Sequence, residues 1–193
     1  MPFAFEKTPI EGLLIARPKV FEDERGFFME AFSRKDFSSA GIDIEIVQIN
    51  HSRSTRGVIR GLHFQRPPHQ QAKLVRCVKG AVLDVAVDIR PSSETFGKHF
   101  RLELSESNKA LLFVPRGFAH GFLILSEVAE VEYAVDSAYS PEHEGGIIWN
   151  DPTLAIQWPV SNPVLSERDR RWPKLGEIKD SLSQGERESE RHA

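Results

Sequence analysis

Two histidines lie within stretches that are otherwise apolar enough to form buried strands. His63 lies in segment 57–65, GVIRGLHFQ, and His120 lies in segment 113–122, FVPRGFAHGF. An imidazole takes up and releases a proton near neutral pH, so either histidine could act as a general base or bind a metal. A lone strand histidine is more often a hydrogen-bonded structural residue. Other parts of the chain must decide between these interpretations.

The strand that contains His63 also carries a cation and a glycine. Successive side chains of a strand point to opposite faces, so Gly61 and His63 are predicted to share one face and Arg60 to face the other way. Gly61 has no side chain, which leaves room for a close approach beside the histidine.

Three further side chains could assist a histidine base. Lys73 and Arg76 have opposite strand parity, so these two cations are predicted to face opposite sides. Tyr133 shares parity with apolar neighbours and is predicted to point into the core. Asp169 lies in a late coil that could fold back towards a histidine. The structural alternatives are a solvated lysine, a tyrosine bonded to a backbone carbonyl, and a surface carboxylate.

A metal site is not predicted. Residues 115–120 have the spacing Pro-x-Gly-x-x-His, which resembles the second metal-binding motif of the cupin superfamily. The first cupin motif requires His-x-His and a downstream glutamate, whereas His63 is followed by Phe64 and Gln65. Two histidines without a carboxylate make a poor iron or zinc site. Cys77 is the single cysteine, which excludes an intrachain disulfide and a cysteine-based zinc site. No cofactor is expected.

The elements that would position these residues are predicted to be mostly strands. Apolar alternation and turn signals recur at short intervals, with one short helix capped by Ser33, and this pattern is typical of an antiparallel sandwich or jelly roll. The predicted fold class is therefore all-β, with a few short helices and an irregular C-terminal region. The predicted strands are 13–18, 27–32, 44–51, 57–65, 72–79, 82–89, 99–104, 111–114, 121–125 and 129–136.

Length and composition favour one domain. The chain has 193 residues, and we expect residues 1–175 to form the domain and the polar residues 176–193 to form a flexible tail. A net charge of -3 gives no electrostatic reason to expect nucleic acid or an anionic membrane as a partner. The N-terminus lacks the features of a signal peptide and no apolar run is long enough to span a bilayer, so a soluble cytoplasmic protein is expected.

Taken together, the motifs resemble those of the dTDP-4-dehydrorhamnose 3,5-epimerase (RmlC) family. The resemblance extends from about Leu13 to Trp172 and is carried by RGLHFQ (60–65), QAKLVRCVKG (71–80), LDVAVDIR (83–90), PRGFAHGF (115–122), GIIWNDP (146–152) and LSERD (165–169). It implies a metal-free, homodimeric cupin jelly roll that inverts C3 and C5 of a 4-keto sugar attached to dTDP, in rhamnose biosynthesis.

The resemblance also implies roles for the residues that could do chemistry. The C4 ketone acidifies the protons at C3 and C5, so that a base can remove each one to give an enolate. His63 matches the family base and Asp169 the carboxylate that pairs with it. Lys73 matches the cation near the C4 oxygen, and Tyr133 matches the acid that returns a proton to the opposite face.

Substrate-binding residues are implied in the same way. Arg25 and Glu30 match positions that hold the nucleotide end across the dimer interface. The other positions are Gln48, Asn50 and Arg60 for the diphosphate and nucleotide, Tyr139 for stacking on thymine, Glu144 for a further ligand contact, His120 beside the sugar, and Arg168, where the family has a lysine before the carboxylate.

Departures from the family pattern leave alternatives open. The lysine that often follows the tyrosine acid is replaced by Ala134, and Ile49 replaces a common aspartate. An epimerase that acts only at C3, or a ketoisomerase, on a related dTDP-4-keto-6-deoxy sugar shares most of these motifs. From other classes, we considered a metal-dependent cupin oxygenase and a non-catalytic sugar-nucleotide-binding module. The module would be expected to lack His63, Tyr133 or Asp169, and all three are present.

Overall fold

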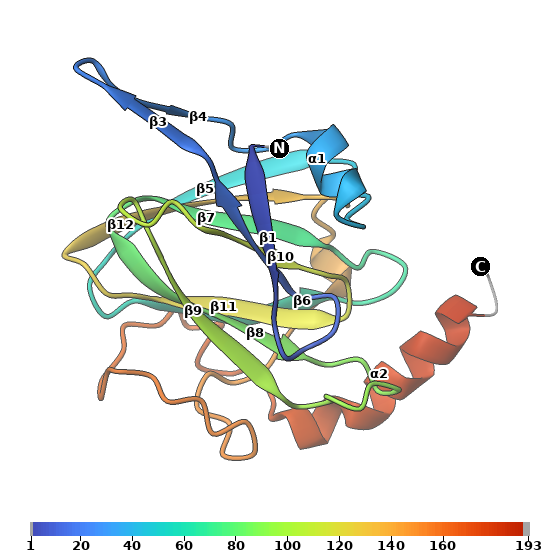
Figure 1. Cartoon of the computed structure of the whole chain (residues 1–193). Helices are drawn as coiled ribbons and strands as arrows, with labels where there is room; N and C mark the ends of the chain where they lie inside the picture. The colour runs from blue at the N-terminus through green and yellow to red at the C-terminus, as the bar shows by residue number, and fades with distance from the viewer. Residues whose placement is uncertain (1, 191–193) are drawn as a thin grey trace.

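Two antiparallel sheets face each other in the computed structural model, which describes residues 2–190 (Figure 1). The first sheet has the order β1 (Phe3–Lys7), β2 (Leu14–Pro18), β10 (Leu111–Val114), β7 (Lys73–Lys79), β12 (Val128–Val135), β5 (Gln48–Thr55). The second has the order β13 (Glu144–Gly146), β6 (Ile59–Gln65), β11 (Phe118–Ile124), β8 (Ala81–Asp88), β9 (His99–Ser105). The predicted antiparallel double sheet is confirmed.

The core lies between the inner faces of the two sheets. Val75 and Val131 from the first sheet pack with Val82 and Phe122 from the second, and all four side chains are buried. Each of these strands alternates inward apolar residues with outward ones, which is why the sequence pattern predicts strands here. One end of the space between the sheets is lined by polar side chains instead.

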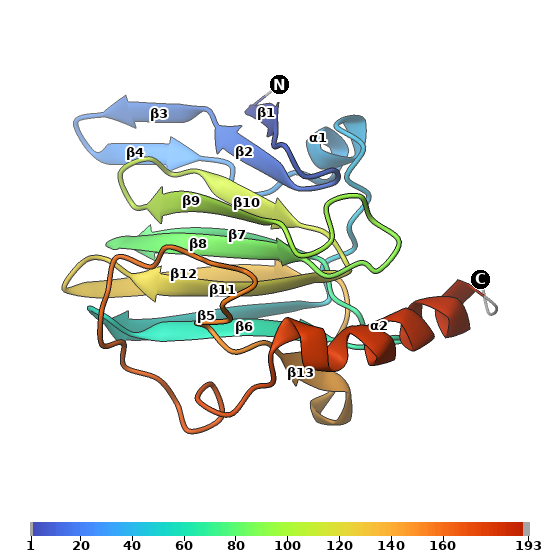
Figure 2. The same ribbon diagram turned by 90° about the horizontal axis from the view of Figure 1, so that it is seen from below.

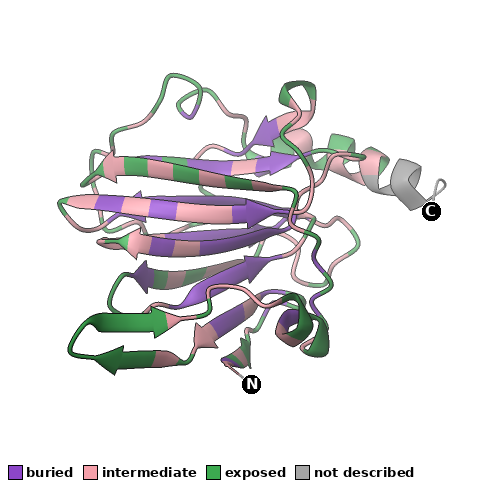
Figure 3. Ribbon diagram, turned by 90° about the horizontal axis from the view of Figure 1, so that it is seen from above, coloured by how far each residue is buried: buried purple, intermediate pink, exposed green. Residues whose placement is uncertain are grey.

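A two-stranded hairpin stands apart from both sheets. It consists of β3 (Val20–Asp23) and β4 (Gly26–Met29), and it projects from the body of the molecule with mostly exposed side chains (Figures 1 and 3). Phe27 and Phe28 are 59% and 67% exposed, although large aromatic side chains are usually covered. The predicted strand 27–32 is shorter than expected, because β4 ends at Met29.

The short helix predicted after Ser33 is confirmed as α1 (Arg34–Ser39). The Ser33 side chain accepts a hydrogen bond from the backbone N–H of Asp36, which satisfies one of the free donors at the helix N-terminus. Phe37 of α1 is buried in edge-to-face contact with Phe3 and Phe5, with ring centroids 5.2 Å and 5.1 Å apart. This contact fixes α1 to the outer face of the first sheet, of which β1 is an edge strand.

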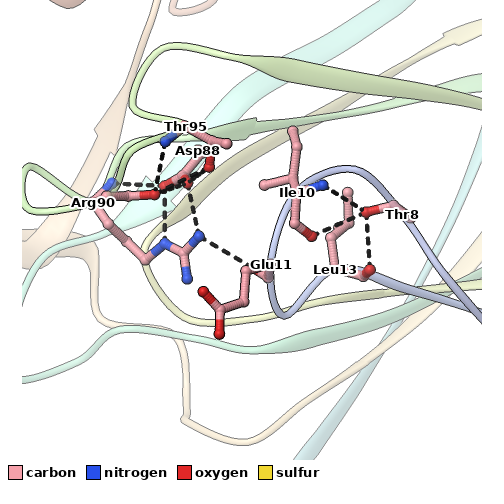
Figure 4. A network of polar contacts seen from close by, with 8 residues as sticks. Thr8, Ile10, Glu11, Leu13, Asp88, Arg90 and Thr95 are labelled. Atoms are coloured by element: carbon pink, nitrogen blue, oxygen red, sulfur yellow. Dashed lines mark hydrogen bonds and ion pairs between the residues drawn. The ribbon is translucent and has the colours of Figure 1, made fainter.

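A buried ion pair holds the end of β8 against the turn between β1 and β2 (Figure 4). Asp88 is fully buried and accepts hydrogen bonds from the Arg90 guanidinium at 2.7 Å and 2.9 Å and from the Thr95 hydroxyl at 2.6 Å. Burial raises the pKa of Asp88, but these hydrogen bonds outweigh it and keep the pKa below its usual value. Arg90 also donates to the carbonyl of Glu11, 3.1 Å away.

The C-terminal region differs from the flexible tail expected over 176–193. Residues Leu175–Glu190 form helix α2, which lies against the outer face of the second sheet (Figure 2). Leu175, Ile178 and Leu182 recur at helical spacing and pack on that sheet, so a few apolar residues in a polar segment suffice to dock it. Residues 191–193 lie outside the described part of the chain. Among the described residues, no helix is long and apolar enough to cross a membrane.

Candidate active site

A cavity of about 430 Å³ opens between the two sheets. Its polar lining includes most of the residues that the sequence singles out, namely Arg60, His63, Lys73, His120, Tyr133, Tyr139, Glu144, Arg168 and Asp169. A second hollow of about 180 Å³ shares five of these residues and adds Gln48 and Asn50. Because they share these residues, the two hollows are parts of one site.

A bulge in β6 brings Arg60 and His63 into the same cavity. In the register with β11, His63 pairs with His120 and Arg60 pairs with Phe122, so three steps along β6 match two steps along β11. One extra residue reverses the alternation of side chains beyond it. The prediction that Arg60 and His63 face opposite ways is therefore wrong.

Gly61 lies within this bulge and permits it. Its φ is +139°, and a Cβ atom there would lie 2.5 Å from the Cα atom of Gly121. The predicted close approach beside the histidine is confirmed, but the approaching group is the backbone of β11 rather than a ligand.

The late coil brings Asp169 to His63. Val164 pairs with β6, since its N–H donates to Gly57 at 2.9 Å and its carbonyl accepts from Ile59 at 3.0 Å. Five residues further on, Asp169 Oδ1 lies 2.5 Å from His63 Nε2. Asp169 is 4% exposed, and burial alone would raise its pKa. The hydrogen bond and charge of His63 outweigh this effect and hold the pKa of Asp169 below its usual value, so Asp169 stays ionised at neutral pH.

Lys73 is buried in the cavity instead of being solvated. It is 7% exposed, and its Nζ atom lies 3.5 Å from the His63 carbonyl oxygen. Burial lowers its pKa to about 8, and the negative charges of Asp84 and Glu144 offset part of that effect. Arg76 pairs with Glu132 outside the cavity, at 2.9 Å, so the prediction that the two cations face opposite sides is confirmed.

Tyr133 faces the cavity from the sheet opposite His63. It belongs to β12 of the first sheet and packs beside the core, as its strand parity predicts. Burial raises the pKa of its hydroxyl; the positive charge of Arg60 lowers it, and the negative charge of Glu144 raises it further. Tyr133 therefore keeps its proton at neutral pH and is able to donate it.

His120 forms a second histidine–aspartate pair deeper in the site. Its Nε2 atom lies 2.9 Å and 3.0 Å from the two carboxylate oxygens of Asp84, which is fully buried on β8. Sequence reasoning missed Asp84, although a charged residue at an inward position of the apolar strand Val82–Val87 is a visible signal. The carboxylate gives His120 a fixed orientation towards the cavity.

The rim of the site is a network of long polar side chains. The Tyr139 hydroxyl and Arg168 both donate to Glu144 Oε2, at 2.9 Å and 2.5 Å. Gln48 accepts from the backbone N–H of Tyr139 at 3.1 Å and donates to Asn50 at 2.7 Å. Tyr139 is 49% exposed, which leaves its ring available for stacking.

Arg25 and Glu30 are not brought to the cavity. Both are exposed at the β3–β4 hairpin, and Arg25 forms an ion pair with Asp23 of the same hairpin at 2.5 Å. Neither residue lines a hollow that contains His63. Within residues 2–190, no group of three or more His, Cys, Asp or Glu side chains is placed to hold a metal ion.

The arrangement can move protons on two sides of a bound molecule. A histidine–carboxylate pair and a protonated tyrosine face one cavity from opposite sheets, and a buried lysine lies beside the histidine. A base, an acid and a fixed positive charge are the groups that enolisation of a carbonyl compound requires.

Comparison with known proteins gives consistent matches over most of the chain. A family model described as dTDP-4-dehydrorhamnose 3,5-epimerase matches residues 7–177. The dTDP-4-dehydrorhamnose 3,5-epimerase of Shigella flexneri is 57% identical over 164 residues, which cover 84% of this chain and 91% of that protein. The enzyme of that name from Escherichia coli K12 is 52% identical over 174 residues, which cover 89% and 94%.

Solved structures agree with this pattern. A dTDP-6-deoxy-D-glucose-3,5-epimerase from Legionella pneumophila, in complex with dTDP-4-keto-L-rhamnose, has a TM-score of 0.90 and 44% identity, over 93% of this chain and 96% of that one. ChmJ, a 3'-monoepimerase from Streptomyces bikiniensis in complex with dTDP-quinovose, has a TM-score of 0.88 and 34% identity, over 97% and 98%.

Proposed function

The chain belongs to the dTDP-4-dehydrorhamnose 3,5-epimerase family, and we propose that it inverts C3 and C5 of dTDP-4-dehydro-6-deoxy-D-glucose by proton transfer between His63 and Tyr133. It is an isomerase of dTDP-L-rhamnose biosynthesis. The main support for the proposed mechanism is that His63 and Tyr133 line the same cavity from opposite sheets.

His63 acts as the base in this mechanism. Its imidazole removes the proton from C3 or C5, and the electron pair of the broken C–H bond forms the C=C bond of an enolate with C4. Asp169 accepts a hydrogen bond from the imidazolium and stabilises its charge. Proton transfer by such a positioned base is worth about 10²–10⁴-fold in rate.

Lys73 stabilises the enolate. Negative charge develops on the C4 oxygen as the proton leaves, and a fixed cation in a water-poor site has its greatest effect there. Lys73 is buried, and because its pKa is about 8 it is mostly protonated and positively charged at neutral pH.

Tyr133 returns a proton to the face opposite His63. The enolate carbon takes the phenolic proton, a new C–H bond forms, and the configuration at that carbon is inverted. Water then reprotonates the phenolate, while His63 releases the first proton. The raised pKa of Tyr133 favours this role, because the hydroxyl carries its proton when the enolate forms.

The rim binds the nucleotide end of the substrate. Arg60 is exposed at the mouth of the cavity, and a guanidinium is suited to bidentate contact with a diphosphate. We assign thymine stacking to Tyr139, nucleotide contacts to Gln48 and Asn50, and a ligand contact to Arg168. Glu144 orients Tyr139 and Arg168 through the hydrogen bonds that it accepts from them. His120, held by Asp84, contacts the sugar.

The active form is a homodimer in this proposal. The β3–β4 hairpin projects from the chain and exposes Phe21, Phe27 and Phe28, which a partner subunit would cover. A hairpin that reaches a neighbouring cavity would deliver Arg25 and Glu30 to the nucleotide there. The enzyme is expected to work in the cytoplasm, where the free and buried Cys77 stays reduced.

Analysis of the product tests the proposed reaction against its main alternative. The purified chain is incubated with dTDP-4-dehydro-6-deoxy-D-glucose, the keto product is reduced with borohydride, and the sugars are identified after hydrolysis. Because hydride can add to either face of C4, the 3,5-epimerase reaction gives rhamnose together with its C4 epimer. A product inverted at C3 alone would instead assign the chain to the 3'-monoepimerases, of which ChmJ is structurally similar to it. Unchanged substrate would contradict both activities.

A further inference from the structure

Trp172 lies against the His63–Asp169 pair without being part of it. Its Nε1–H donates to Asp169 Oδ1 at 3.3 Å, the same oxygen that lies 2.5 Å from His63 Nε2. The indole and imidazole rings meet edge to face, with centroids 6.1 Å apart. Trp172 therefore contacts both members of the pair and lies on the coil that carries Asp169.

The indole ring is fixed by its surroundings. A Cβ atom on Gly146 would lie 2.4 Å from the Trp172 ring, so the ring lies directly on the backbone of β13. Gly146 is also the residue opposite His63 in the β13–β6 register. On another side, the Arg168 guanidinium lies 6.0 Å from the ring centroid, within range of a cation–π contact.

We propose that Trp172 is a positioning residue for proton transfer, which holds the Asp169 carboxylate with one oxygen towards His63 and covers it from water. Two donors on one carboxylate oxygen define its orientation better than one, and a hydrogen bond to a charged group is stronger than one between neutral groups. The proposal rests on the proposed function, because Trp172 acts through the pair assigned there as the base.

The expected consequence concerns turnover more than substrate binding. Trp172→Phe keeps an aromatic ring on Gly146 but removes the N–H that Asp169 accepts. Losing a hydrogen bond to a charged group should lower kcat about tenfold, while KM should change by less than about twofold. A merely structural loss would instead lower the amount of folded enzyme and leave both constants of the folded fraction unchanged.

Trp158→Phe is the matched control. Trp158 also donates its Nε1–H, but to the backbone carbonyl of Trp149 at 2.8 Å and not to Asp169. Its replacement should leave kcat and KM as in the wild type. Thermal unfolding of both variants separates stability from turnover.

The decisive measurement is a double-mutant comparison by deuterium exchange of the substrate. If Trp172 acts through Asp169, Trp172→Phe should slow exchange about tenfold in the wild type but less than about twofold in an Asp169→Asn background. An equal factor in both backgrounds, or no slowing in the wild type, would overturn the proposal. Absence of exchange by the wild-type enzyme would instead refute the proposed function.

Discussion

The three ionisable side chains around His63 differ in charge at neutral pH, because burial and nearby charges shift their pKa values differently. Desolvation lowers the pKa of Lys73 to about 8 and raises that of Tyr133, whereas contacts with His63 overcome desolvation and keep the pKa of Asp169 low. The result is an ionised Asp169, a protonated Tyr133 and a Lys73 whose charge is sensitive to pH. A base, an acid and an electrostatic stabiliser can thus work together in one cavity.

Activity should fall in alkaline solution as Lys73 loses its proton. Lys73 is charged below its pKa of about 8 and neutral above it, so kcat/KM should decrease as pH rises through that value. Lys73→Arg keeps the charge at all these pH values, so its profile should lack this decrease even if the larger side chain lowers the rate. A wild-type rate that stays constant from about pH 7 to 9.5 would contradict the role of Lys73.

Tyr133→Phe should separate proton removal from inversion. The base remains, so substrate protons should still exchange with D₂O, but inverted product should fall about 10²-fold or more because no acid serves the opposite face. Proton NMR of the recovered substrate and analysis of the reduced sugar measure the two steps. Normal inversion at both carbons would show that another group is the acid.

At the scale of single residues, the sequence allows most of the site to be predicted. The resemblance identifies His63, Lys73, Tyr133 and Asp169, and the structure gathers all four in one cavity. Asp84 and Trp172 were not identified because their importance lies in contacts with His120 and His63, which come from distant segments. Strand parity alone could not show those contacts.

At the scale of elements, the bulge in β6 determines which side chains enter the cavity. Gly61 and Gly121 lie face to face, and their backbones approach too closely for a side chain on either one. Strand alternation predicts the wrong face for Arg60 because a pattern of period two has no signal for one extra residue. Strand β12 was predicted correctly because its own side chains alternate without interruption; the extra residue in its pairing with β7 lies on β7.

Gly61→Ala should be clearly more destabilising than Gly57→Ala. Both residues have positive φ, but a Cβ atom on Gly61 meets the backbone of β11, whereas one on Gly57 meets nothing within 4 Å. The expected loss in free energy of unfolding is about 2–4 kcal/mol for Gly61→Ala and about 1 kcal/mol for Gly57→Ala. Urea denaturation measures both. Equal losses would show that the close approach of β6 and β11 is unimportant.

Helix α2 shows where composition misleads. Its segment is polar enough to predict a flexible tail, yet Leu175, Ile178 and Leu182 dock it on the second sheet. Average hydropathy hides a narrow apolar stripe, and that stripe stabilises a helix only when a partner surface exists. The partner is a set of side chains from distant strands, which the local sequence does not reveal.

At the scale of the whole molecule, the exposed hairpin points to sites shared between subunits. Arg25 and His63 lie in different parts of one chain, although both are assigned to the same substrate. In a closed two-fold dimer, each hairpin can reach the cavity of the other subunit, so that Arg25 of one chain and His63 of the other can contact the same substrate. In the proposed dimer, each active site is therefore made from two chains.

Mixing two inactive variants should restore activity. In a heterodimer of His63→Ala and Arg25→Ala chains, one cavity has both lesions and the other has an intact His63 and an intact Arg25. Random exchange of subunits should recover about a quarter of the wild-type activity. Each variant alone is the control, and analytical ultracentrifugation checks that all samples are dimers. A mixture no more active than its components would contradict shared sites.

The most direct test of the central claim follows the protons themselves. The enzyme is incubated with dTDP-4-dehydro-6-deoxy-D-glucose in D₂O, and proton NMR monitors the signals at C3 and C5. The proposed mechanism predicts that deuterium enters both positions with the wild type and neither position with His63→Ala. Exchange by His63→Ala at the wild-type rate, or no exchange by the wild type, would contradict it.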